Sequence, residues 1–187
     1  MKKGRFIMRI IAGIAKGRKL KSIENSEVRP TLDRVKEAIF NILGPLVQDC
    51  NILDLFAGFG NLGLEALSRG ANKVTFVEKN YKNSSIIKSN LELCNFQDRG
   101  KVITEDVFTY LKRETVKFDM IFMDPPYQKN LIENTLKKIV NINLIYNDSI
   151  IIGEMYHKIT LKIPESLHII KQKKYGDTRI DFYSRGG

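Results

Sequence analysis

The feature that most constrains this chain is an alternation of short apolar segments with longer amphipathic ones, which runs from Asn51 to Tyr156. The short segments have the composition and length of buried strands, and the longer ones have helical length and periodicity. The expected strands are 51–56, 73–78, 101–105, 118–123 and 149–156, and the expected helices are 61–69, 80–94, 106–114 and 129–141. This order predicts an α/β fold with a mostly parallel sheet, helices on both faces and right-handed crossovers.

The end of the chain departs from this alternation. Residues 167–173 and 179–184 are two more strand candidates, joined around Tyr175-Gly176-Asp177, and they predict an antiparallel hairpin. In an open sheet of this kind the ligand crevice lies beyond the carboxyl ends of the parallel strands. Residues that directly follow those strands are therefore the first candidates for a functional site.

The N-terminal segment carries most of the excess positive charge. The net charge of the chain is +10, and residues 1–21 hold eight Lys or Arg and no acid. Apolar residues alternate with these cations, so we expect two short strands, 8–12 and 18–23, that form a basic hairpin around Gly13–Gly17. A strongly basic face indicates a polyanionic partner such as nucleic acid.

A helix is expected after the hairpin, with Thr31 as its N-cap and Gly44-Pro45 as its end. We therefore divide the chain into an N-terminal hairpin and helix, 1–45, and a main domain, 46–187.

Several classes of protein are disfavoured. Arg9 and Lys16 interrupt the apolar stretch near the N-terminus, which argues against a signal peptide, and no apolar run approaches the roughly 20 residues of a membrane span. Cys50 and Cys94 lack metal-ligand or redox spacing. We expect a cytoplasmic monomer without a metal or a membrane partner.

The first strand of the sheet runs into a glycine loop. Gly58, Gly60 and Gly63 fit the pattern G-x-G-x-x-G, and Glu78 ends the next strand, so a dinucleotide cofactor has to be considered. Asp54 argues against it, because its carboxylate would repel a pyrophosphate but attract the ammonium and sulfonium groups of S-adenosylmethionine.

Two further acids fit such a cofactor. Glu78 suits paired ribose hydroxyls in either interpretation, and Asp106 can recognise an adenine amino group or cap the following helix. The residues expected to hold the cofactor are Asp54, Phe56, Ala57, Gly58, Gly60, Glu78, Lys79, Asp106 and Val107.

The motif that indicates the chemistry is Asp124-Pro125-Pro126-Tyr127, which follows the strand 118–123. The two prolines predict a rigid, extended turn with free backbone carbonyls. Asp124 and a carbonyl, such as that of Pro125, could accept both hydrogens of an exocyclic base amine and turn its lone pair toward a methyl group. Tyr127 offers a ring on which a flipped-out base can stack.

With these motifs, the chain resembles the bacterial 16S ribosomal RNA guanine-N2 methyltransferases, over nearly its whole length from Met8. The matching residues are Met8-Arg9-Ile10-Ile11-Ala12-Gly13, Arg29-Pro30-Thr31, Asp33-Arg34-Val35-Lys36-Glu37, Leu53-Asp54-Leu55-Phe56-Ala57-Gly58, Leu62-Gly63-Leu64-Glu65-Ala66, Phe76-Val77-Glu78, Asp124-Pro125-Pro126-Tyr127 and Tyr175-Gly176-Asp177-Thr178. Residues 1–7 precede the usual start, and Phe59-Gly60-Asn61 replaces the small residues that this family often has there.

The resemblance implies a seven-stranded methyltransferase sheet, S-adenosylmethionine as donor, and a guanine amino group of 16S rRNA as acceptor. It also implies that the substrate is presented within a partly or fully assembled small ribosomal subunit. Basic residues of the N-terminal part would then hold RNA phosphates: Arg9, Lys16, Arg18, Lys19, Arg29 and Arg34.

Three alternatives stay open on the residues alone. A DNA adenine-N6 methyltransferase uses the same tetrapeptide chemistry, but it usually needs a larger target-recognition region. A protein glutamine methyltransferase usually has Asn where this chain has Asp124. An RNA-binding assembly factor with a vestigial pocket would not need Asp54, Glu78 and Asp124.

Overall fold

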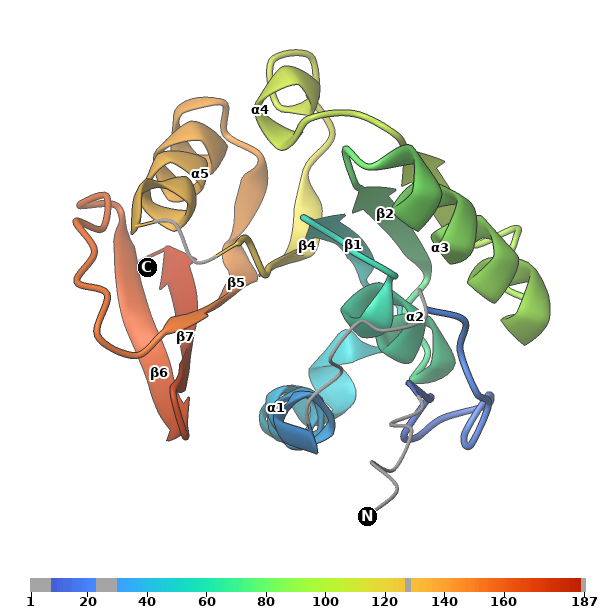
Figure 1. Ribbon diagram of the computed structural model, residues 1–187. Coiled ribbons are helices and arrows are strands. Elements are labelled where there is room, and N and C mark those ends of the chain that lie inside the picture. The colour runs from blue at the N-terminus through green and yellow to red at the C-terminus, as the bar shows by residue number, and fades with distance from the viewer. Residues whose placement is uncertain (1–7, 23–29, 127–128, 186–187) are drawn as a thin grey trace.

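The sheet predicted from the alternation is present in the computed structural model, which describes residues 8–22, 30–126 and 129–185. Its strands lie in the order β3-β2-β1-β4-β5-β7-β6 (Figure 1). The strands are β1 (Asn51–Leu55), β2 (Lys73–Val77), β3 (Gly100–Ile103), β4 (Phe118–Met123), β5 (Ile145–Tyr156), β6 (Leu167–Tyr175) and β7 (Thr178–Arg185). The helices in the described residues are α1 (Pro30–Leu43), the 3₁₀ helix η1 (Gly44–Val47), α2 (Asn61–Ser68), α3 (Tyr81–Cys94), α4 (Val107–Tyr110) and α5 (Lys129–Asn141).

The direction of the strands follows from how they are connected. Strands β1 to β5 pair in parallel, because a helix or helical turn returns the chain after each of the first four. Strand β7 pairs antiparallel with both β5 and β6, since a tight turn joins β6 to β7. The predicted parallel sheet with an antiparallel C-terminal hairpin is confirmed, and the chain has the seven-stranded, Rossmann-like sheet of class I methyltransferases.

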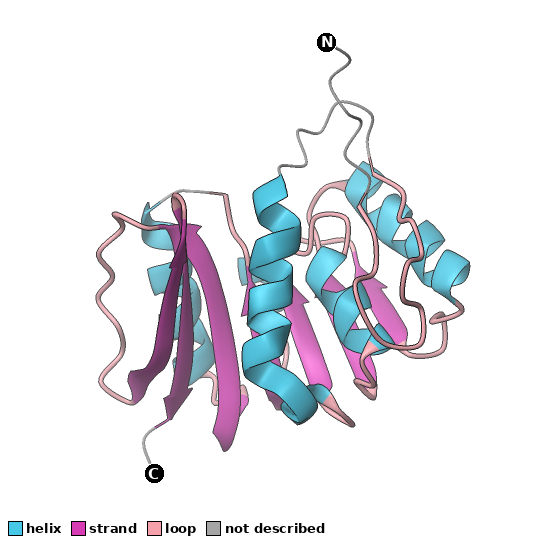
Figure 2. Cartoon of the chain, turned by 90° about the horizontal axis from the view of Figure 1, so that it is seen from below, coloured by secondary structure: helices cyan, strands magenta, loops and turns pink. Residues whose placement is uncertain are grey.

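Helices cover both faces of this sheet (Figures 1 and 2). Because successive side chains of a strand point to opposite faces, each buried strand contributes to two cores. In β4, Phe122 packs in one core with residues of α1, α2 and α3, whereas Ile121 packs in the other with residues of α4 and α5. Within the described residues, no helix is both long enough and apolar enough to cross a bilayer.

The N-terminal segment docks on α2 and pairs antiparallel, as the predicted hairpin requires, but over a shorter length. Arg9 and Lys19 form a β-bridge, with backbone hydrogen bonds from Ile10 N–H to the Arg18 carbonyl at 3.0 Å and from Leu20 N–H to the Met8 carbonyl at 2.7 Å. The N–H groups of Ile11 and Ala12 donate instead to the Glu65 carboxylate, at 2.7 and 3.0 Å. The pairing therefore ends after Ile10, and the two strands are shorter than the sequence predicted. Residue 23, the last of the second expected strand, lies outside the described residues.

The ends of two elements also differ from the prediction. Helix α1 begins at Pro30, so Thr31 lies inside the helix and is not its N-cap; proline is favoured at the first helical position. The helix ends at the expected place, where Gly44 adopts a φ of 52°. Strand β5 begins at Ile145, earlier than expected, because its first residues also pair with Phe118 across a shift in register.

Helix α4 is much shorter than the predicted helix 106–114. The carboxylate of Glu114 accepts hydrogen bonds from the N–H groups of Thr115 and Val116, at 2.9 and 2.8 Å, and from the Tyr110 hydroxyl. These bonds hold the chain in a turn toward β4, so the helix does not continue.

Gly63 lies where α2 packs against β2. A Cβ atom on Gly63 would lie 2.3 Å from a ring carbon of Phe76 and 2.8 Å from a methyl group of Val74. Both distances are far shorter than a van der Waals contact. The third glycine of the loop pattern is therefore required by the approach of the helix to the sheet.

We expect Gly63→Ala to lower the free energy of unfolding by about 1–3 kcal/mol, because the added methyl group overpacks the core. Alanine would otherwise be favoured over glycine in a helix. Replacing the ring by Phe76→Leu should relieve the clash, so the double variant should lose less than the sum of the two single variants. Urea denaturation of the four proteins measures this, and strictly additive losses would contradict the packing explanation.

Candidate active site

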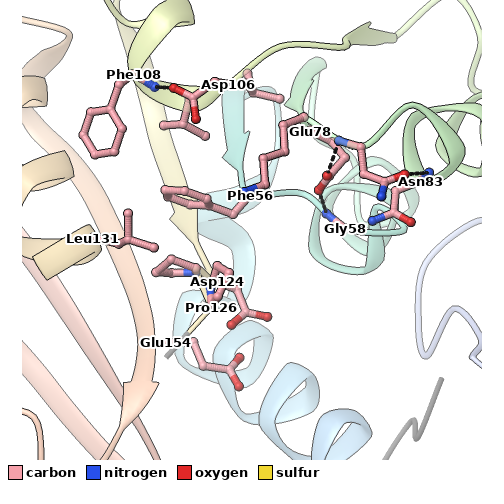
Figure 3. Close-up of a pocket in the computed structure, with 15 residues that line it drawn as sticks. Phe56, Gly58, Glu78, Asn83, Asp106, Phe108, Asp124, Pro126, Leu131 and Glu154 are labelled. Carbon is pink, nitrogen blue, oxygen red and sulfur yellow. Dashed lines mark hydrogen bonds between the residues drawn. The ribbon is translucent and has the colours of Figure 1, made fainter. Parts of the chain in front are cut away.

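A cavity of about 610 Å³ opens at the carboxyl edge of the parallel strands (Figure 3). It brings together the glycine loop after β1, the acid after β2, the start of α4 and the tetrapeptide after β4. Predicted residues that line it are Phe56, Gly58, Glu78, Lys79, Asp106, Val107, Asp124, Pro125 and Pro126. Asp54, Ala57 and Gly60 are not among its lining residues, and Tyr127 lies outside the described residues.

The glycine loop has an unusual backbone. Phe56, Gly58 and Gly60 have φ values of 59°, 55° and 82°. The left-handed region suits glycine but is rare for a bulky side chain such as that of Phe56, and such conformations cluster at functional sites. The loop is fixed to β2, because Gly58 N–H donates to the Glu78 carboxylate at 2.9 Å.

Glu78 is buried, with 7% of its surface exposed, and lies at the end of β2. One carboxylate oxygen accepts from Gly58 N–H, and the other accepts from Asn80 N–H at 2.7 Å (Figure 3). These two bonds hold the carboxylate at the cavity wall. Each oxygen keeps a further lone pair, so the group can still accept hydrogen bonds from a ligand.

Asp106 takes the helix-capping role, one of the two that the sequence left open. One of its carboxylate oxygens accepts from the N–H groups of Phe108 and Thr109, at 2.9 and 3.2 Å, and so caps α4. The residue is exposed and also lines the cavity (Figure 3). The cap holds the Asp106 carboxylate at the rim of the cavity, where a ligand can still reach it.

Asp54 lies deeper than the other acids. It is 3% exposed and accepts a hydrogen bond from Gly63 N–H at 3.0 Å. Burial raises the pKa of this carboxyl to about 7, the Gly63 hydrogen bond opposes the rise, and the charges of Asp124 and Glu78 add to it. Asp54 does not line the cavity wall, but it interacts electrostatically with Asp124 and Glu78, which do.

Asp124 and Glu154 form a pair of acids at the ends of β4 and β5 (Figure 3). Asp124 is open to the cavity, but the surrounding walls shield its carboxyl from bulk water and raise its pKa to about 6. Burial raises the pKa of Glu154 well above its usual range, and the neighbouring Asp124 charge raises it further. Sequence reasoning missed Glu154, because only the pairing of β4 with β5 places this acid beside Asp124.

Other residues that line the cavity were not identified from the sequence. They are Val77, Asn80, Asn83, Phe108, Leu131 and Glu154.

The predicted RNA-contacting residues lie on the N-terminal part of the molecule. Arg9, Lys16, Arg18 and Lys19 are exposed, and Arg9 also forms an ion pair at 3.7 Å with Asp33. Arg34 lines a second hollow, between α1 and β6, together with Lys171, Lys173 and Tyr175. Arg29 lies outside the described residues.

Hydrogen bonds tie this N-terminal segment to the glycine loop. The Asn90 side chain accepts from Lys21 N–H at 2.7 Å and donates to the carbonyls of Lys21 and Phe59, at 3.1 and 3.3 Å. Lys36, which is 1% exposed, donates to the Arg9 carbonyl and to the side chain of Asn61, at 2.6 and 2.8 Å. The basic surface therefore has a fixed position relative to the cavity.

The raised pKa of Asp54 predicts a pH dependence of stability. Between its ordinary value of 3.8 and its folded value of about 7, the folded state holds a proton that the unfolded state releases, so stability should fall as pH rises through this range. Asp54→Asn keeps an acceptor for Gly63 N–H but does not titrate. We expect this variant to lose less stability than the wild type between pH 5 and 7, by up to about 1.4 kcal/mol per pH unit.

Urea denaturation at several pH values measures the difference. Asp98→Asn, at an exposed position, is the matched control and should follow the wild type. Identical slopes for wild type and Asp54→Asn would contradict a raised pKa at this carboxyl.

Comparison with known proteins agrees with this architecture. The family described as conserved hypothetical protein 95 matches residues 8–184. The protein of Haemophilus influenzae named ribosomal RNA small subunit methyltransferase D is 38% identical over 90% of this chain and 89% of its own, and the Escherichia coli K12 protein of that name is 32% identical over 95% and 90%. The solved structure of Escherichia coli yhhF has a TM-score of 0.87 and 28% identity, covering 97% of this chain and 99% of that one. The chain therefore belongs to the conserved hypothetical protein 95 family, together with these relatives named ribosomal RNA small subunit methyltransferase D.

Proposed function

We propose that this protein transfers a methyl group from S-adenosylmethionine to the N2 amino group of a guanine in 16S ribosomal RNA. The observation that carries the proposal is the single cavity lined by Gly58, Glu78 and the Asp124-Pro125 segment. Relatives that cover most of the chain are named as methyltransferases of small-subunit ribosomal RNA, which supports the choice of substrate.

The residues of the cavity fit S-adenosylmethionine better than a dinucleotide. Glu78 has spare acceptors for ribose hydroxyls, and Asp106 has a second carboxylate oxygen, without a hydrogen bond from any described residue, for an adenine amino group. Asp54 and Asp124 add negative charge nearby, which favours a cation and opposes a pyrophosphate. When bound, S-adenosylmethionine would supply an electrophilic methyl group.

The tetrapeptide supplies the groups that a base amine needs. The amine lone pair is delocalised into the ring, so the amine is a poor nucleophile until both hydrogens are held. The Asp124 carboxylate and the Pro125 carbonyl are the acceptors that we assign to those hydrogens, and the prolines fix their direction. Positioning and electrostatics then carry most of the rate. We assign base stacking to Tyr127.

Asp124 can also handle the proton that the reaction releases. Methylation of a neutral amine leaves a positive nitrogen that must lose a proton. The pKa of the Asp124 carboxyl is raised to about 6, which makes it a better acceptor for that proton than an ordinary aspartate.

We expect Asp124→Ala to lower the rate of methyl transfer at least roughly a hundredfold, because one fixed acceptor of the transition state is lost. Affinity for S-adenosylmethionine should stay within a few-fold, as measured by calorimetry. The rate is followed by incubating small subunits, and separately naked rRNA, with labelled cofactor, and mass spectrometry then maps the modified nucleotide.

The matched control for this experiment is Asp98→Ala, which removes an exposed carboxylate that does not line the cavity. Near-normal turnover by Asp124→Ala would refute the mechanism. Absence of any heat of cofactor binding to the wild type would instead favour an assembly factor with a vestigial pocket.

The basic N-terminal surface gives a second prediction. Replacing Arg9, Arg18 and Lys19 together by alanine should weaken RNA binding and reduce its salt dependence, because fewer counterions are released. Cofactor affinity should not change.

The control variant loses the same number of positive charges, but on the other side of the sheet. It replaces three exposed lysines whose neighbours in the sequence belong to the core that contains α4 and α5. These are Lys112, Lys158 and Lys162. Filter binding or fluorescence anisotropy across a range of salt concentrations compares the two variants. If the dependence of RNA affinity on salt concentration is unchanged in the Arg9, Arg18 and Lys19 variant, the N-terminal segment is not part of the RNA interface.

A further inference from the structure

The pairing of β4 with β5 places two acids next to each other at the cavity. Met123 and Gly153 are partners in the parallel register, so Asp124 and Glu154 are the next residues of the two strands. Both line the cavity, and Figure 3 shows their carboxyl groups side by side. A base amine held at Asp124 would therefore bring the adjoining edge of the base to Glu154.

Glu154 has no evident structural role to explain its burial. It is 5% exposed, and within the described residues no hydrogen bond or ion pair reaches its carboxyl group. Because Glu154 lines the cavity, its carboxyl group faces the space that a ligand would fill, whereas most buried polar groups have a hydrogen-bond partner within the protein. Burial and the Asp124 charge raise its pKa, because both disfavour the charged form. A donor from a ligand would favour that form.

The chemistry of the bases identifies such a donor. On the Watson–Crick edge of guanine, the N2 amino group lies beside N1–H, so two neighbouring donors face outward. Beside the amino group of adenine, and beside that of cytosine, the adjacent ring nitrogen is an acceptor. When both groups are ionised, two adjacent carboxylates accept only, so the ionised pair matches guanine and opposes the other two bases.

We propose that Glu154 is a specificity-determining residue that accepts the guanine N1–H while Asp124 holds the N2 amine. This inference rests on the proposed function. It adds that the choice of guanine is made inside the cavity by a pair of carboxyl groups, in addition to any contacts that the RNA makes with the basic surface.

The test compares guanine with 2-aminopurine at the modified position. 2-Aminopurine keeps the amine but has an unprotonated N1, so it has no hydrogen for Glu154. Small subunits are reconstituted from ligated rRNA that carries either base, and kcat/KM is measured at mildly alkaline pH for wild type, Glu154→Leu and the exposed control Glu165→Leu. Intrinsic differences between the two bases cancel when the guanine to 2-aminopurine ratio is compared between proteins.

We expect wild type and Glu165→Leu to prefer guanine, and we expect the preference of Glu154→Leu to fall at least about tenfold. Stability should be unchanged or higher in Glu154→Leu, because an unpartnered buried carboxyl is replaced by an apolar group of similar size. If Glu154→Leu turns over too slowly, the ratio is taken from Glu154→Gln, whose amide can donate to the free N1 and should also narrow the preference.

An unchanged ratio in these variants, with guanine methylated normally by the wild type, would overturn the role of Glu154 and leave the proposed function standing. Failure of the wild type to methylate any guanine at N2 would overturn the proposed function, and this inference with it.

Discussion

The site depends on one constraint of parallel sheets, which is that their strands all end at the same edge. Strand β1 pairs with β2 on one side and with β4 on the other, and β5 continues the parallel order. Groups far apart in the sequence, such as Gly58, Glu78, Asp124 and Glu154, therefore face one cavity. The register of the sheet brings together the glycine loop, the tetrapeptide and the acid of β5. Direct contacts among these three features are therefore not needed to place them.

A buried carboxylate connects this edge to the basic surface. Glu65 in α2 is fully buried, accepts two N–H groups of the N-terminal segment, and forms an ion pair at 2.8 Å with Arg69. The ammonium of Lys36 lies 3.6 Å from it, and burial lowers the pKa of this lysine while the Glu65 charge opposes the change. Loss of one partner would leave a buried charge unpaired. This network fixes the basic segment to the helix that follows the glycine loop.

The sequence predicted those parts of the structure that local pattern determines. Strand 118–123 has the predicted bounds, and the parallel part of the sheet agrees with the alternation, because both depend on apolar periodicity. The N-terminal hairpin is shorter than predicted, and beyond its paired residues the N–H groups of Ile11 and Ala12 donate to a side chain that is distant in the sequence, that of Glu65. Glu154 was missed for a related reason, since a single acid in an apolar strand acquires meaning only when the register places it beside Asp124.

Positive and negative side chains lie in different parts of this molecule. Their separation matches the charges of the two ligands of the proposed reaction, an anionic RNA and a cationic cofactor. The net charge is +10, and the N-terminal segment exposes cations, whereas Glu78, Asp106, Asp124 and Glu154 put acids along the cavity. A polyanion held by the exterior is repelled by this interior, so its phosphates stay outside and an uncharged base is the part that can enter. A cationic cofactor meets the opposite field and is drawn inward. In the proposed reaction the acids would therefore act before the chemical step, by selecting electrostatically which part of each ligand enters the cavity.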